Sequence, residues 1–86
     1  MNKHTAVLPD GNIATRNSKT RVYTHAVAYR PTYKGIQADR WYVSSYAGSL
    51  ALAEKAKAAL ISRGNHPLNN GNFAGGLYAI IEVEVA

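Results

Sequence analysis

The chain has 86 residues and no cysteine, and its ten Lys and Arg outnumber five Asp and Glu, for a net charge of +5. This length predicts one small domain over residues 1–86, with a thin core and no enclosed substrate cavity unless subunits share one. The missing cysteines exclude a disulfide scaffold and thiolate-ligated zinc or iron–sulfur sites, and no apolar run reaches the ~20 residues of a membrane span. No signal peptide is recognisable, so we expect a cytoplasmic protein, with no membrane as its partner.

The first segments predict a hairpin. Residues 4–8 form a short strand and residues 13–16 return beside it, around Pro9, Asp10 and Gly11. Pro presets the first φ of a reverse turn, Asp bonds the local backbone and Gly accepts a positive φ. Residues 17–20 are polar and predict a turn or a bulge.

Residues 21–30 alternate between two kinds of side chain, as a strand does when its two faces differ. Ala26 and Ala28 belong to the small set, which suits a face that a helix approaches closely. The other set is large, basic or aromatic, so we expect it on the opposite face, either open or covered by a partner. That set consists of Arg21, Tyr23, His25, Val27 and Tyr29.

The following segments predict a turn, a strand and a helix. Residues 31–35 are typical of a turn whose link runs on to residue 39, and residues 41–46 are β-rich, with Tyr42 and Tyr46 on one face. Ser49 is a suitable N-cap for a helix over 50–63, and Gly64 a suitable C′ residue. The expected buried stripe of this helix is rich in alanine: Leu52, Ala53, Ala56, Ala59, Leu60 and Arg63.

An Asn- and Gly-rich loop over 64–76 precedes a final strand over 77–85. A connection of this length without secondary structure is usually functional or disordered. The odd-numbered residues of this strand are apolar and are expected in the core: Leu77, Ala79, Ile81, Val83 and Val85. The order β-β-β-β-α-β predicts an α+β fold, an antiparallel sheet with one helix packed on one face.

The cations and aromatics between residues 16 and 40 are the best candidate binding site, because cations neutralise phosphates and aromatic rings stack on unpaired bases. The alternative is that these rings fill a second core or a subunit interface, and a bare Tyr-rich face would favour a homodimer. The candidate strand residues are Arg16, Lys19, Arg21, Tyr23, His25, Tyr29, Arg30 and Lys34. The candidate loop contacts are Asn69, Asn70, Asn72 and Phe73.

Catalytic and metal sites are not expected. His25 is a conceivable general base, but no acid stands at a spacing that would orient it, and the neighbouring Thr24 should point to the opposite face. The spacing of His4, His25 and His66 matches no metal-ligand signature, and His4 lies at a terminus expected to fray. We therefore predict a protein without catalytic residues, metal or cofactor.

Over residues 9–11 and then 15–27, with the stretch Tyr-Thr-His-Ala-Val, the chain resembles small bacteriophage accessory proteins. The resemblance implies a phage-encoded protein acting in the host cytoplasm, often as a host-defence inhibitor of anti-CRISPR type. Its partner would be a defence protein or ribonucleoprotein complex. Because the chain is basic, it cannot act as an acidic DNA mimic. It would occupy a Cas protein or its nucleic acid, by covering an acidic patch or joining the nucleic acid of the complex, or it would sequester a nucleotide signal. The alternative is a small basic module that binds single-stranded nucleic acid.

Overall fold

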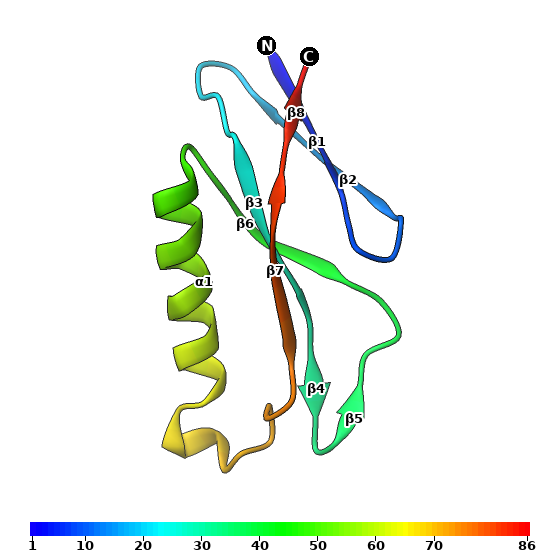
Figure 1. The fold of residues 1–86 in the computed structure, drawn as a ribbon, viewed down its shortest axis with the longest axis vertical. Coiled ribbons are helices and arrows are strands. Elements are labelled where there is room, and N and C mark those ends of the chain that lie inside the picture. Colours follow the sequence, from blue (N-terminus) through cyan, green and yellow to red (C-terminus); the bar gives the residue numbers. More distant parts are fainter.

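Two three-stranded antiparallel sheets meet at the last strand of the chain. The computed structural model describes residues Met1–Ala86. In it β7 (Leu77–Glu82) belongs to the sheet β6-β3-β7, and β8 (Glu84–Val85), one residue later, belongs to the sheet β2-β1-β8. With the single helix α1 (Leu50–Gly64) on one side, the molecule measures 42 × 24 × 17 Å (Figure 1). The predicted α+β class is confirmed, with strands before and after one helix.

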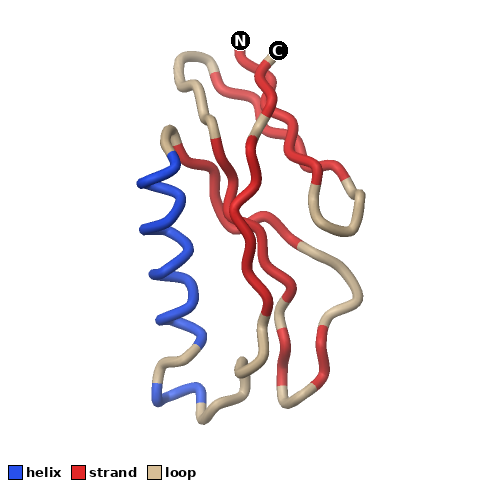
Figure 2. The backbone as a smooth tube through the Cα atoms, viewed as in Figure 1, coloured by secondary structure: helices blue, strands red, loops and turns tan.

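The N-terminal hairpin forms as its turn residues predict. β1 (Asn2–Val7) pairs with β2 (Ile13–Ser18), and Gly11 takes a φ of 86° in the turn. The Asp10 carboxylate accepts the Asn12 backbone N–H at 2.9 Å, the local bond for which an aspartate is favoured there. Both termini lie side by side at this end, because β1 and β8 are paired (Figure 2).

A β-bulge changes which face each tyrosine of β6 occupies. In the pairing of β3 (His25–Arg30) with β6 (Tyr42–Ala47), Val27 lies opposite Ser45 but Ala28 lies opposite Val43. Residues directly opposite each other share a face, so Tyr46 shares the face of Ala26, while Tyr42 shares that of Tyr29. The prediction that Tyr42 and Tyr46 share one face is wrong, since the extra residue of the bulge reverses the alternation.

Helix α1 packs on the face that carries Val27. Val27, Ala47 and Ala53 form the buried core there, and partly buried Ala56, Leu60 and Ile80 pack against it. The prediction that Ala26 and Ala28 face the helix is therefore wrong. The buried stripe of α1 is narrower than expected, because Leu52 is 56% exposed. In β7 the residue that packs against this core is Ile80, whereas the sequence predicts the odd-numbered residues there.

The other face of this sheet is covered by the N-terminal hairpin. Ala26 and Ala28 are fully buried on that side, and the ring of His4 in β1 lies 6.5 Å from the ring of Tyr46. Small side chains allow a second layer to approach closely, which is the property that had suggested a helix there. Because the face is not bare, the argument for a homodimer loses its structural basis.

The ends of α1 are capped by local side chains. The Ser49 hydroxyl accepts the Leu52 N–H at 3.2 Å, as predicted for the N-cap. Gly64 is the last helical residue rather than a left-handed C′ residue, and Asn65 is the C-cap. A Cβ at Gly64 would stand 3.2 Å from the Tyr78 hydroxyl, so the glycine permits the close approach of that tyrosine.

Two connections contain more structure than expected. β4 (Thr32–Tyr33) and β5 (Ile36–Gln37) form a hairpin around Lys34 and Gly35, whose φ values of 50° and 80° match a type I′ turn. In the 64–76 segment, a short 3₁₀ helix, η1 (Pro67–Asn69), follows Gly64. Asn69 donates its side-chain amide to the Arg63 carbonyl at 2.7 Å, so the segment caps α1 rather than being an unstructured loop.

Candidate functional site

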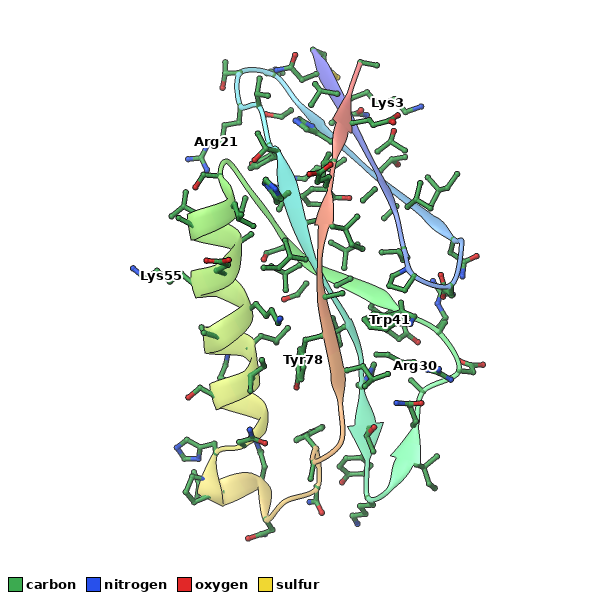
Figure 3. All side chains as sticks on the ribbon, viewed as in Figure 1. Lys3, Arg21, Arg30, Trp41, Lys55 and Tyr78 are labelled. Atoms are coloured by element: carbon green, nitrogen blue, oxygen red, sulfur yellow. The ribbon has the colours of Figure 1, made fainter.

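The structure divides the predicted site between the two ends of the molecule. Figure 3 shows Arg21 beside the first turn of α1 and Arg30 near the β4-β5 hairpin, far along the long axis. The residues of the first end lie in β2 and the connection to β3: Arg16, Lys19, Arg21 and Tyr23. Those of the other end are Tyr29, Arg30, Lys34 and the loop residues. They do not form one continuous strand face, because residues 21–24 are outside β3.

At the first end, Arg16 is stacked on two tyrosine rings. Its guanidinium carbon lies 5.3 Å from the ring centroid of Tyr23 and 5.7 Å from that of Tyr46. The two rings are 5.9 Å apart, at an interplanar angle of 49°. Both are half-buried while Arg16 is exposed, so the cation lies on the outer side of the pair. We call these three residues, together with His4, the Arg16 cluster.

His4 forms the floor of the Arg16 cluster and is fully buried rather than frayed. Its Nε2 accepts the Tyr23 backbone N–H at 2.9 Å, and its Nδ1 lies 3.1 Å from the Arg16 carbonyl oxygen. An amide N–H only donates and a carbonyl only accepts, so the ring bonds both partners when its proton is on Nδ1. The expectation of a frayed terminus is wrong because β1 is the middle strand of its sheet.

Burial changes the ionisation of Tyr46 within the Arg16 cluster. Desolvation raises the pKa of the Tyr46 hydroxyl above its usual value, and the charge of Arg16 opposes this in part. The phenol is therefore neutral at physiological pH, and its ring presents an uncharged π-face to Arg16. Such a face attracts a cation without neutralising its charge, so Arg16 remains available to an anion.

The remaining cations of this end are near the Arg16 cluster in sequence and exposed. Lys19 and Arg21 occupy the β2–β3 connection, where the Ser18 hydroxyl accepts the Arg21 backbone N–H at 2.9 Å. His25 is half-buried, and Thr24 Oγ1 lies 2.7 Å from its Nδ1. The expectation that Thr24 points away from His25 is therefore wrong, because Thr24 precedes the regular strand.

At the other end, a cleft of about 460 Å³ opens between α1 and the β6-β3-β7 sheet. Tyr29 and Tyr78 line it from the sheet, Leu60 and Arg63 from the helix, and Phe73 from the 64–76 segment. Figure 3 shows Tyr78 between the helix and the sheet. We call this the α1 cleft; it brings together Tyr29, Asn69 and Phe73 of the predicted site.

Several predicted contacts of this end make structural bonds instead. Arg30 Nε donates to the Ala38 carbonyl at 2.6 Å, and the Asn72 carbonyl accepts the Lys34 N–H at 2.7 Å. Lys34 Nζ also lies 5.4 Å from the Tyr33 ring centroid, and that ring is 5.4 Å from Phe73. Asn70 adopts a left-handed φ of 52° as the C-cap of η1. The Lys34–Asn72 bond and the Tyr33–Phe73 contact hold the hairpin β4-β5 against the 64–76 segment.

Four residues that matter at the two ends were absent from the sequence-based site. Strand pairing and helix packing bring these residues to the two ends: His4 and Tyr46 contact the cluster around Arg16, and Arg63 and Tyr78 line the α1 cleft with Tyr29. Of the four, only His4 could be recognised from the sequence. It shares a strand face with the apolar Ala6 and Leu8, and a histidine buried on such a face requires hydrogen-bond partners.

No protein-family model, curated protein or solved structure matches the chain. Nowhere in the structure do three or more His, Cys, Asp or Glu side chains gather as a metal site would require. Neither helix has the length and apolar character needed to cross a bilayer.

Proposed function

We propose that the protein acts by binding, and that the Arg16 cluster holds single-stranded nucleic acid. The observation that carries this proposal is the exposed guanidinium of Arg16 over the rings of Tyr23 and Tyr46. A guanidinium stacked on rings keeps its N–H edges free, and those edges match the geometry of a phosphate. Lys19 and Arg21, exposed in the connection that follows β2, add positive charge to the same part of the chain and favour a polyanion.

Stacking on these tyrosines is sequence-tolerant, because every base has a π-face. The half-buried rings of Tyr23 and Tyr46 expose part of their surface, and a base next to an Arg16-bound phosphate would contact them. This arrangement would therefore bind unpaired strands with little base preference.

The resemblance to phage accessory proteins suggests where such binding would be used. An inhibitor of anti-CRISPR type could occupy the nucleic-acid component of a defence complex, and a net charge of +5 suits that target better than nucleic-acid mimicry. The competing hypothesis is that the protein binds an acidic surface of a defence protein directly, without contacting nucleic acid.

The test is the titration of a labelled single-stranded oligonucleotide at several salt concentrations. Arg16→Gln should weaken binding about tenfold at low salt, as expected for a charge-assisted bond, and lower the log–log salt slope by about 0.7 if one phosphate contact is lost. The fold should survive, since His4 bonds the backbone carbonyl of Arg16 and not its side chain.

Lys55→Gln is the matched control, because it removes the same charge from the outer side of α1 (Figure 3). Equal weakening by both variants would reduce the effect to net charge and contradict the proposal. The absence of oligonucleotide binding at low salt, together with capture of a defence protein by purified chain, would favour the acidic-patch alternative.

A further inference from the structure

The α1 cleft has the size and lining of a small-molecule site. Its volume of about 460 Å³ falls within the ~300–1,000 Å³ range of ligand pockets. Aromatic rings approach it from three elements: Tyr29 of β3, Tyr78 of β7 and Phe73 of the 64–76 segment. A flat ring is the ligand shape that several aromatic walls favour.

The charge of the cleft is positive. Arg63 is the one ionisable cation in its lining, no carboxylate lines it, and its other polar groups include the Thr32 and Ser44 hydroxyls. By contrast, the smaller hollow of about 270 Å³ on the flank of α1 is lined by Glu54 and Lys57 and by no aromatic ring. The α1 cleft therefore suits an anion, and the smaller hollow does not.

The carboxyl end of a helix carries partial negative charge, which would oppose an anion. Here the last carbonyls are already bonded: Ile61 accepts from Asn65, and Arg63 accepts from His66 and from the side chain of Asn69. The Asn69 amide also reaches the Gly64 carbonyl at 3.3 Å. These bonds leave the Arg63 side chain as the main electrostatic feature of the cleft.

The position of Tyr78 keeps the cleft in shape. Both Gly64 and Gly76 approach its hydroxyl so closely that a Cβ on either would stand 3.2 Å away. Phe73 contacts Tyr33, with ring centroids 5.4 Å apart and planes tilted by 47°, and the backbone bond from Lys34 to Asn72 fixes that segment. The aromatic walls are thus held from both sides before any ligand arrives, which lowers the ordering cost of binding.

We propose that the α1 cleft binds a nucleotide unit, with its base among Tyr29, Phe73 and Tyr78 and its phosphate on Arg63. This site is separate from the Arg16 cluster, so it stands or falls independently of the strand-binding function. The same chemistry could come from a free mononucleotide or from one unit of a bound strand.

The experiment is calorimetric titration with AMP and UMP, with adenosine and inorganic phosphate as partial ligands. We expect mononucleotides to bind with a dissociation constant below about 1 mM and both partial ligands to bind at least tenfold more weakly. Arg63→Gln should reduce mononucleotide affinity about tenfold or more, and Phe73→Leu about fivefold. Lys55→Gln, on the same helix, should leave it unchanged.

Binding that Lys55→Gln weakens as much as Arg63→Gln, or that adenosine matches, would overturn the proposal, as would the absence of mononucleotide binding. Competition of an oligonucleotide with bound AMP would identify the site as one for a strand unit, whereas its absence would identify a site for the free nucleotide. Oligonucleotide binding that is lost in Arg16→Gln but intact in Arg63→Gln separates this site from the Arg16 cluster.

Discussion

The two faces of the β6-β3-β7 sheet are covered in different ways. On one face, α1 contributes small side chains, with Ala53 fully buried against Val27, and a cleft of about 460 Å³ remains toward the end of the helix. On the other face, the buried ring of His4 from the N-terminal hairpin lies 6.5 Å from the ring of Tyr46 in β6. The same ring bonds the Arg16 carbonyl within the hairpin and the Tyr23 backbone N–H in the connection to β3. The hairpin side thus has a buried, fully bonded histidine between its layers, whereas the narrow alanine stripe of α1 leaves space that a ligand can enter.

Among variants that test the two faces, we expect the largest loss of stability from His4→Ala on the hairpin side. His4→Ala would leave the Tyr23 N–H without its partner, remove the bond between the ring and the Arg16 carbonyl and open a void, so we expect a loss of about 3 kcal/mol in the free energy of unfolding. Urea denaturation measures it. His66→Ala is the control, because that exposed ring caps only η1 and should cost about 1 kcal/mol or less. Equal losses of stability in His4→Ala and His66→Ala would show that the buried His4 ring stabilises the fold no more than the exposed His66 ring does.

The helix-covered face should respond to added volume. Ala53→Leu inserts a large side chain where α1 touches Val27, and overpacking of this kind costs about 1–3 kcal/mol. Ala51→Leu makes the same change at an exposed position of α1 and should stay within about 0.5 kcal/mol of the parent. Thermal denaturation of both variants compares them. If Ala53→Leu were as stable as Ala51→Leu, the contact between helix and sheet would be looser than the structure describes.

The smallest expected effect on stability concerns Asp10, which joins the turn of the N-terminal hairpin to Trp41, the residue before β6. Its carboxylate accepts the backbone N–H of Asn12 and, at 3.1 Å, that of Trp41, and these bonds lower its pKa from the usual 3.8. A carboxyl with a lowered folded-state pKa stabilises the fold above its unfolded-state pKa, and this contribution disappears as the pH falls through the folded-state pKa.

The melting temperature of the parent should therefore exceed that of Asp10→Ala at pH 6, and the difference should shrink as the pH falls below about 4. Asp39→Ala supplies the control for removing an exposed acid from the same region. A difference that stayed constant down to pH 2 would show that the ionised carboxylate does not hold the turn.

Local signals predicted much of the fold. The turn at Asp10 and Gly11, the N-cap at Ser49 and the strand–helix–strand order depend on residues that are close in sequence, and the structure contains each of them. The faces could not be predicted in the same way. Alternation predicts a face only while a strand is regular, and both residues 21–24, which lie outside the regular strands, and the bulge of β6 interrupt it.

The candidate site was predicted in part for the same reason. Arg16 and Tyr23 were identified by their type, and the structure does bring them together, but their partner Tyr46 comes from another strand. Tyr29 and Phe73 were also named, yet they belong to a separate cleft whose cation, Arg63, had been assigned to the buried stripe of the helix. Composition identifies the kinds of side chain that bind, but it does not place them at one end of the molecule or the other.

The sequence alone determined the charge, the turn chemistry, the single helix and the α+β class, because these follow from composition and from interactions within a few residues. Tertiary structure decided which face of the sheet meets α1, because both faces of β3 carry side chains that can be buried. Either α1 or the N-terminal hairpin could therefore pack on each face. It also decided that His4 is buried and that the basic segment divides between two ends of the molecule, since pairing of β1 with β8 and packing of α1 join residues far apart in sequence.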